Sequence, residues 1–213
     1  MKIMLRSDQM RHSQANRDFR IQKTQTQLRQ ALMTLLQTQH MSQISVADLT
    51  REAGITRSTF YLHYADKNEF VDQVGNELQE AFFKHVIAYT YTTEINAFPV
   101  MNLERTFAFL AESHQDYLLI DQALDGQFST RIDHEVERLL KLFAAENDLV
   151  AVTSEPPIEM VIQYMVTSHM GFIRQWLDSG MIYSAPYMAK MLKALGEVHT
   201  PGLERLNDFF IAR

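Results

Sequence analysis

Apolar side chains recur every three or four residues along most of the chain, which is the spacing of a helix with one buried face. The first such helix is predicted from Arg20 to about Gln39, where Leu28, Leu32 and Leu35 mark the buried side. Residues 1–17 are polar and mixed in charge, and we expect them to form a flexible arm.

Cap signals divide the next part of the chain. The sequence SVAD, which begins at Ser45, is a capping box for a second helix. Gly54 supplies the backbone freedom for a sharp turn, and Thr56 caps a third helix that runs through Tyr64. The sequence DKNE at 66–69 is a stronger capping box that opens a long helix with an apolar residue every four positions.

The rest of the chain is also helical in pattern, and no stretch of it shows sustained strand alternation. We predict helices over residues 100–114, 116–124, 128–147, 157–179, 186–197 and 200–210, separated at Pro and Gly residues. The predicted fold class is all-α. The flexible arm, 1–17, precedes a three-helix domain with a helix-turn-helix, 18–66, and a larger helical domain, 67–213.

Composition supports a helical protein with a sizeable core. The 213 residues are 46% apolar, with seven Gly and five Pro, and the absence of Cys excludes disulfides and thiolate metal sites. The most apolar stretch, Met160 to Ile173, is too short to span a membrane. The N-terminus lacks the apolar run of a signal peptide, so we expect a cytoplasmic protein that does not enter a membrane.

Charge is distributed unevenly between the two parts of the chain. Residues 1–70 carry ten Lys and Arg against six Asp and Glu, whereas the remaining residues carry ten against twenty. The excess of positive charge in residues 1–70, which we call the head, suggests that only this part of the chain faces a polyanion. A solvated surface can show the same imbalance.

The segment ITRSTFYLHYADK, residues 55–67, combines an apolar face with many hydrogen-bond donors. Two short helices joined at a glycine form a helix-turn-helix, whose second helix enters the major groove of DNA. Phe60 and Tyr64 can pack inward, which leaves outward the side chains that meet bases and phosphates, namely Arg57, Ser58, Tyr61 and His63. The turn alone leaves open a helical protein that does not bind DNA.

The segment ISVADLTREAGITRSTFYLHYADKNEFVDQV resembles the DNA-binding domain of the tetracycline-repressor (TetR) family of bacterial regulators. The shared elements are the hydroxyl cap, the AGI turn at 53–55, the ST-F-Y core at 58–61, an aromatic residue at Tyr64 and the lysine at Lys67. The resemblance covers roughly residues 20–75. The segment RIQKTQTQLRQAL is similar to the branch that contains regulators of dihydroxyacetone-kinase operons.

The resemblance implies a role for each matching residue. Phosphate contacts are implied for Ser45, Tyr61, His63 and Lys67, with Arg20 and Lys23 beside the backbone, and base readout for Arg57 and Ser58, with Thr56 at the edge. Thr50 and Ala47 depart from the family pattern, which puts helix packing and one contact in doubt. The arm at 1–17 either follows a minor groove or remains a disordered tail.

The helix at 157–179 carries more apolar surface than one core requires. We expect it to pair with the helix at 186–197 across a two-fold axis, as the family does, in a four-helix interface. The predicted interface residues are Ile158, Ile162, Val166, Met170, Tyr187, Met188 and Met191. The alternative is that both apolar stripes belong to the core of a single chain.

Aromatic and polar-tipped residues gather in the larger domain. The resemblance implies a ligand pocket beneath the fourth helix, and the candidates are His85, Tyr89, Phe107, His114, Tyr117, Tyr164 and His169. An aromatic stripe at helical spacing can instead be core, and a partner protein can replace a small molecule as the effector.

No enzyme motif accompanies these features. The eight His show no HExxH spacing, and the chain contains neither GxSxG nor a phosphate-binding glycine loop, so we expect no enzyme, metal or cofactor. The sequence therefore predicts a homodimeric repressor that binds palindromic double-stranded DNA under the control of a small-molecule or protein effector. The alternative is a helical interaction module or coactivator whose effector is a partner protein.

Overall fold

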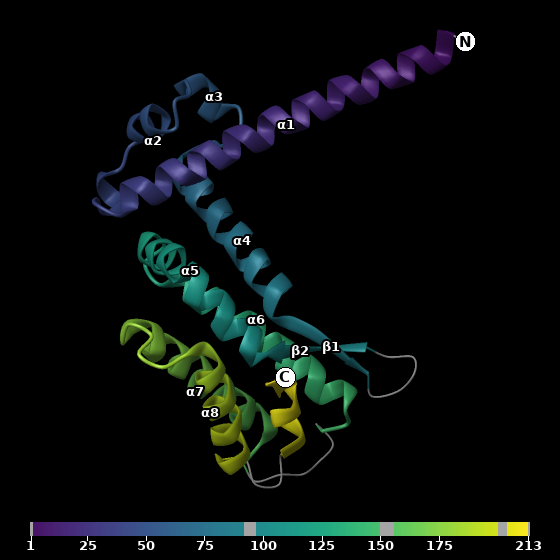
Figure 1. The fold of residues 1–213 in the computed structure, drawn as a ribbon, viewed down its shortest axis with the longest axis vertical. Coiled ribbons are helices and arrows are strands. Elements are labelled where there is room, and N and C mark those ends of the chain that lie inside the picture. The colour runs from purple at the N-terminus through teal and green to yellow at the C-terminus, as the bar shows by residue number, and fades with distance from the viewer. Residues whose placement is uncertain (1, 92–96, 150–155, 200–203, 213) are drawn as a thin grey trace. The chain divides into compact units, whose positions relative to one another are not determined.

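A computed structural model describes residues 2–91, 97–149, 156–199 and 204–212 (Figure 1). Contacts divide the chain into two compact units, Met1–Val74 and Gly75–Arg213. The division falls inside a helix, α4 (Lys67–Val86), rather than before it as the expected domain boundary at residue 66 has it. Each unit is described separately below.

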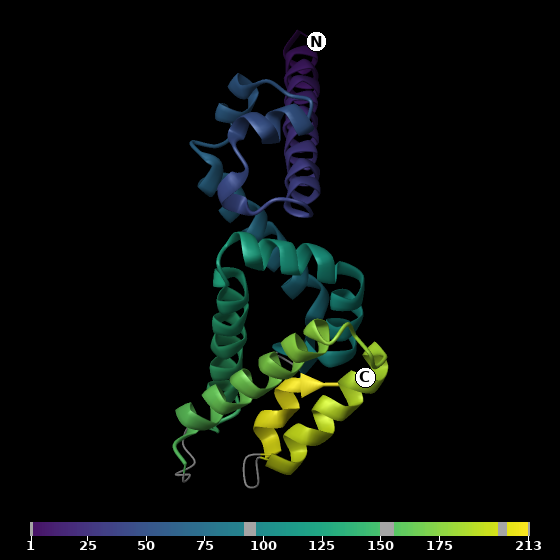
Figure 2. The same ribbon diagram turned by 90° about the vertical axis from the view of Figure 1, so that its left-hand side faces the viewer.

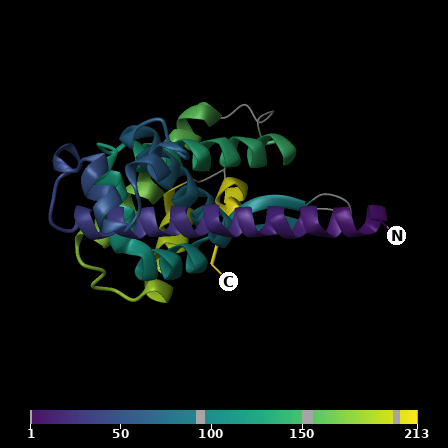
Figure 3. The ribbon, with the colours of Figure 1, turned by 90° about the horizontal axis from the view of Figure 1, so that it is seen from above.

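The first unit is helical throughout its regular elements. It contains α1 (Lys2–Leu36), the 3₁₀ helix η1 (Met41–Gln43), α2 (Val46–Glu52), α3 (Arg57–Tyr61) and the beginning of α4. Figure 3 shows α1 along its whole length. The segment expected to be a loose arm is helical from Lys2, because no Gly or Pro interrupts residues 2–36.

The caps predicted at Ser45, Thr56 and Asp66 are all present. Ser45 accepts a hydrogen bond from the backbone N–H of Asp48, whose carboxylate accepts one from the backbone N–H of Ser45 at 3.0 Å. Gly54 has φ of +66°, in the left-handed region that favours glycine. Helix α3 ends at Tyr61, earlier than the expected end at Tyr64, although Tyr64 is buried as predicted.

The second unit contains a small sheet that the helical pattern did not predict. After α4 come β1 (Ile87–Tyr91), β2 (Ala97–Asn102), α5 (Leu103–Ala123), α6 (Gln127–Glu146), α7 (Ile158–Asp178), α8 (Ala185–His199), η2 (Glu204–Phe209) and β3 (Phe210–Ile211). The order in the sheet is β1-β2-β3, with β1 antiparallel and β3 parallel to β2. The all-α class is confirmed, and the sheet is a local addition to it.

Three helix predictions in this unit need correction. The helices expected at 100–114 and 116–124 are one helix, α5, and residues 100–102 belong to β2. Pro99 is tolerated in β2 because β3 pairs only with Met101 and Asn102. The helix expected at 200–210 is η2 followed by β3, with 200–203 outside the described residues.

Aromatic rings link the helices of the second unit. Phe107 of α5 meets Trp176 of α7 edge-on, with ring centroids 5.0 Å apart. His169 of α7 stacks on Phe210 of β3 at 4.0 Å and an interplanar angle of 13°. Figure 2 shows the C-terminal segment, in yellow, beside α7 and α8. The end of the chain is therefore part of this core.

Candidate DNA-binding surface and helical interface

The short helix α3 presents one anchored face and one open face. Phe60 is fully buried, and its ring lies 5.4 Å from Tyr64 and 5.8 Å from Phe70. Thr56 caps the helix by accepting the N–H of Thr59 at 3.1 Å. The predicted DNA-contacting residues Thr56, Arg57, Ser58 and Tyr61 are all exposed, and His63 is half-buried.

The exposed start of α3 carries a compact set of hydroxyl groups. The Oγ1 of Thr56 lies 2.8 Å from the Oγ of Ser58 and 2.9 Å from the Oγ1 of Thr59. Arg57 follows Thr56 in the chain, is exposed, and takes part in no ion pair among the described residues. Such a surface offers a planar bidentate donor and adaptable hydroxyls to a polar partner.

Ser45 and Lys67, for which the resemblance implies phosphate contacts, both have intramolecular hydrogen-bond partners. The hydroxyl of Ser45 donates to Asp48 at 2.6 Å. Hydrogen bonds from Ser45, followed by the contact with Arg51, lower the pKa of Asp48 to about 2, so that this acceptor stays ionised.

The ammonium group of Lys67 points into its own domain. Its Nζ donates to the carbonyl oxygens of Met41 at 2.8 Å and Ile44 at 2.7 Å. The side chain therefore joins the start of α4 to the loop between α1 and α2. The other two basic candidates, Arg20 and Lys23, are exposed on α1.

Five of the seven predicted dimer residues have their side chains in the core of their own chain. These are Ile158, Ile162, Val166, Met170 and Met188, each at most 7% exposed. Four of these residues belong to the buried stripe of α7 and Met188 to that of α8, so none of the five is exposed within the protomer. Tyr187 is about half exposed and Met191 is partly exposed.

A different set of apolar side chains lies open on α7, on α8 and in the turn between them. Met160 is 63% exposed and Phe172 39% exposed on α7, although both are large and apolar. We define the α7/α8 face as Met160, Tyr164, Phe172, Ile182, Tyr183, Tyr187 and Leu195. Exposed Ile182 and Tyr183 lie outside any periodic helix, so the helical pattern gave no signal for them.

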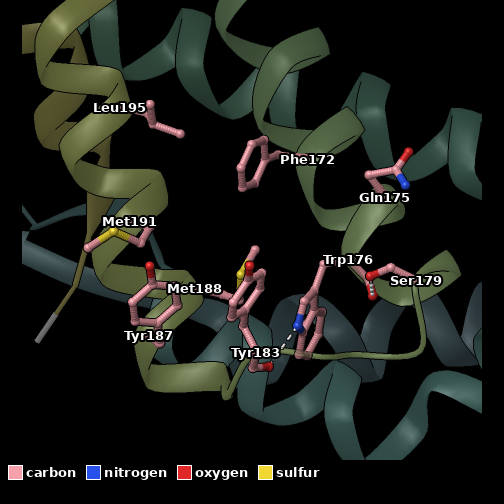
Figure 4. Close-up of a pocket in the computed structure, with 9 residues that line it drawn as sticks. All are labelled: Phe172, Gln175, Trp176, Ser179, Tyr183, Tyr187, Met188, Met191 and Leu195. Atoms are coloured by element: carbon pink, nitrogen blue, oxygen red, sulfur yellow. Dashed lines mark hydrogen bonds between the residues drawn. The ribbon is translucent and has the colours of Figure 1, made fainter.

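Part of this face is a cavity of about 370 Å³ between α7 and α8 (Figure 4). Phe172, Trp176 and Met191 are among its lining residues. The rings of Tyr183 and Tyr187 lie 5.2 Å apart, and the indole N–H of Trp176 donates to the carbonyl of Tyr183 at 2.9 Å. That hydrogen bond fixes the turn against α7.

The predicted ligand residues do not converge on one pocket. Phe107 and Tyr117 are buried in ring contacts with Trp176 and Phe128, and burial raises the pKa of Tyr117. His85 and Tyr89 are exposed, and His114 is half-buried. Tyr164 and His169 line one cavity together.

The described part of the chain contains neither a group of side chains that could hold a metal ion nor a helix that could cross a membrane. No three His, Asp or Glu side chains there are grouped to hold a metal ion. Asp133 instead pairs with Arg174 at 2.7 Å, which joins α6 to α7. Within the described ranges, every helix is too short or too polar to cross a bilayer.

Two protein-family models match the chain. One, described as bacterial regulatory proteins of the tetR family, matches residues 28–74, and the other, described as a transcriptional regulator C-terminal region, matches residues 100–197. The uncharacterized HTH-type transcriptional regulator YxbF of Bacillus subtilis (strain 168) is 30% identical over 94 residues. That match covers 44% of this chain and 24% of the relative, about a quarter of its length.

A solved structure has a similar fold. The dihydroxyacetone kinase operon activator DhaS superposes with a TM-score of 0.53 at 20% sequence identity. The match covers 81% of this chain and 95% of that chain. At this identity the likeness establishes the fold alone.

Proposed function

Because the chain belongs to the tetracycline-repressor (TetR) family of bacterial transcriptional regulators, we propose that it is a cytoplasmic homodimer that represses transcription from a palindromic operator. The observation that carries the proposal is the open face of α3. Arg57, Ser58 and Tyr61 are exposed there on a helix that buried Phe60 holds in place.

The open face of α3 suits the reading of a major groove. Arg57 can bond guanine in bidentate fashion, whereas Ser58 and Tyr61 can reach bases or phosphates. Arg20 and Lys23 add exposed positive charge in the same unit. Ser45 and Lys67 support this surface from within, through their bonds to Asp48 and to the carbonyls of the α1–α2 loop.

A second copy of the chain is the partner proposed for the α7/α8 face. A head of this size reads only a few base pairs, so affinity requires two half-sites about one helical turn apart, roughly 34–36 Å. Large exposed apolar groups gathered on one face are typical of an interaction surface. A two-fold axis would place α7 and α8 of each protomer together in a four-helix interface.

Control by an effector completes the proposal. Helix α4 is continuous from the first unit into the second, so an effector that binds the second unit can favour one separation of the two heads. A second candidate is activation with a partner protein as the effector. DhaS is named an operon activator, and the segment that begins at Arg20 is similar to that branch.

Selection from random duplexes tests DNA reading. We expect enrichment of an inverted repeat, with an affinity that falls steeply as salt rises because phosphate contacts release counterions. If the protein is folded and dimeric but the selection enriches no sequence, the proposal is refuted and the interaction module is favoured. Transcription in vitro from a promoter that contains the selected repeat then separates repression from activation.

Matched charge insertions test the dimer. Phe172 on the α7/α8 face and Leu142 on α6 are both 39% exposed. We expect Phe172→Glu to yield monomers in light scattering and to weaken operator binding, whereas Leu142→Glu remains dimeric. Equal behaviour of the two variants would place the interface elsewhere.

A further inference from the structure

The most exposed large apolar side chain among the described residues lies at the end of α3. Leu62, which directly follows the last residue of this helix, is 80% exposed. In the free protein its isobutyl group therefore gains almost nothing from the hydrophobic effect. Single exposed leucines are common on protein surfaces, so what matters is the face on which this one lies.

Leu62 lies on the same face of α3 as Ser58. Its backbone N–H donates to the carbonyl of Ser58 at 3.2 Å, and its φ of −73° and ψ of −20° continue the right-handed helix by one residue. Side chains four positions apart lie one above the other on a helix. Ser58 and Tyr61 are exposed, whereas Phe60 is fully buried. Leu62 is therefore part of the open face of α3.

The surroundings of Leu62 do not form a surface for a protein partner. Within residues 20–74, all of which the structure describes, Tyr61 and Leu62 alone are large, apolar and exposed. Surfaces that bind proteins gather apolar side chains into patches of about several hundred Å². One isobutyl group on a face with the guanidinium of Arg57 and the hydroxyl of Ser58 suits a small apolar group that is itself set among polar ones.

The major groove of DNA contains such a group. Guanine, adenine and cytosine present hydrogen-bond donors and acceptors there, and thymine adds a methyl group at C5. An apolar side chain recognises thymine by contact with this methyl group, whereas an arginine recognises guanine by hydrogen bonds. Leu62 can therefore read a base that neither Arg57 nor Ser58 distinguishes in the same way.

Spacing along α3 limits where the methyl group lies. Arg57 and Leu62 are separated by five positions, which is about 7.5 Å along a helix axis. Successive base pairs are about 3.4 Å apart, so this distance corresponds to about two base pairs. We expect the thymine within about three base pairs of the guanine that Arg57 reads.

We propose that Leu62 reads a thymine in each operator half-site through van der Waals contact with its C5 methyl group. The inference rests on the proposed function, to which it adds the identity of one base. Because Leu62 carries no charge, its contact contributes to the choice of sequence and not to the general affinity for DNA.

Replacement of thymine by uracil in the selected operator tests this contact, because it removes the C5 methyl group and keeps the hydrogen bonds of the base pair. Each thymine of the half-site is replaced in turn, first in one half-site and then in both, and the affinity is measured by fluorescence anisotropy. At one position we expect the full-length protein to bind about fourfold more weakly for each methyl group removed, as burial of one methyl group predicts. Replacement in both half-sites should weaken binding about fifteenfold.

Leu62→Ala removes the protein side of the contact and should fold, because the side chain is exposed. We expect this variant to bind the thymine and uracil operators equally and to keep its affinity for scrambled DNA. Phe19→Ala is the matched control, since Phe19 is 67% exposed on α1 of the same unit, and it should keep the difference between thymine and uracil.

The outcomes separate this contact from the proposed function. If the wild-type protein binds the selected operator but distinguishes thymine from uracil at no position within three base pairs of that guanine, the contact is refuted and DNA reading stands. A Leu62→Ala variant that retains the difference, or that loses affinity equally on every duplex, would also overturn the contact. If the selection enriches no sequence, the proposed function fails and the contact fails with it.

Discussion

Replacement of Lys67 by Met distinguishes a structural role for this residue from a DNA contact. The substitution keeps the apolar stem of the side chain and removes the bonds to the carbonyls of Met41 and Ile44. Charge-assisted hydrogen bonds contribute about 1.5–3 kcal/mol each. Lys67 is only half-buried and the carbonyl of Met41 also accepts the N–H of Ile44. We therefore expect a total loss of about 2–3 kcal/mol in the free energy of unfolding.

Lys23→Met is the matched control, because it removes the same charge from an exposed position on α1. Urea unfolding followed by circular dichroism, with hydrogen exchange across residues 40–52, should show destabilisation and faster exchange in Lys67→Met alone. DNA affinity should fall in both variants through the lost positive charge. If Lys67→Met matches the control in stability and exchange yet binds all DNA far more weakly, Lys67 contacts phosphate and the structural role is refuted.

Three further predictions concern other parts of the chain. Arg57→Ala should weaken binding to the selected operator by on the order of 1–3 kcal/mol in binding free energy, with little effect on scrambled DNA, as measured by fluorescence anisotropy. An equal loss of affinity for both duplexes would show that Arg57 does not read a base. Gly196→Ala should lower the free energy of unfolding by about 1–3 kcal/mol in urea, because the added Cβ meets buried Asn207, and unchanged stability would contradict this packing. His169 is neutral when folded, with a pKa of about 4 owing to burial and nearby Lys193. In the unfolded state His169 has a pKa near 6.5, so as the pH falls the unfolded state takes up a proton before the folded state does. The free energy of unfolding should therefore fall by about 3 kcal/mol between pH 6.5 and 4. His169→Phe should remove this part of the pH dependence, as measured by urea unfolding at several pH values.

Local signals in the sequence predicted the recognition segment well. The caps at Ser45 and Thr56 and the turn at Gly54 depend on residues within four positions of one another, so the sequence alone contains the geometry. The inward position of Phe60 follows from the same short helix. The inward bonds of Lys67 reach carbonyls more than twenty positions earlier, and no spacing rule indicates such a contact.

The interface was harder to predict because α7 has two apolar faces. Ile162 and Val166 form the buried stripe, whereas Met160, Tyr164 and Phe172 form the exposed one. Hydrophobic periodicity shows that both stripes exist but not which of them meets the protein's own core. That choice depends on α5 and α6, which pack against this region from distant parts of the sequence.

The sheet escaped prediction for the same reason. Strand β3 has two residues, and its pairing of Phe210 with Met101 joins positions more than a hundred residues apart. Pro99 in β2 also favours a helix boundary over a strand when only local pattern is considered. A strand this short has no alternation to detect, and its position follows from the burial of Phe209 and Phe210.

That C-terminal segment connects α7 and α8 to the helix that leads to the DNA-binding unit. Phe210 stacks on His169 of α7 and pairs with Met101 of β2, while Asn207 is in contact with Gly196 of α8. Strand β2 pairs in turn with β1, which follows α4 directly in the chain. Any change in the spacing of α7 and α8 must therefore be accommodated at this segment, against fully buried aromatic rings that cannot compress. We expect an effector that changes the spacing of α7 and α8 to act on α4 through this packed connection.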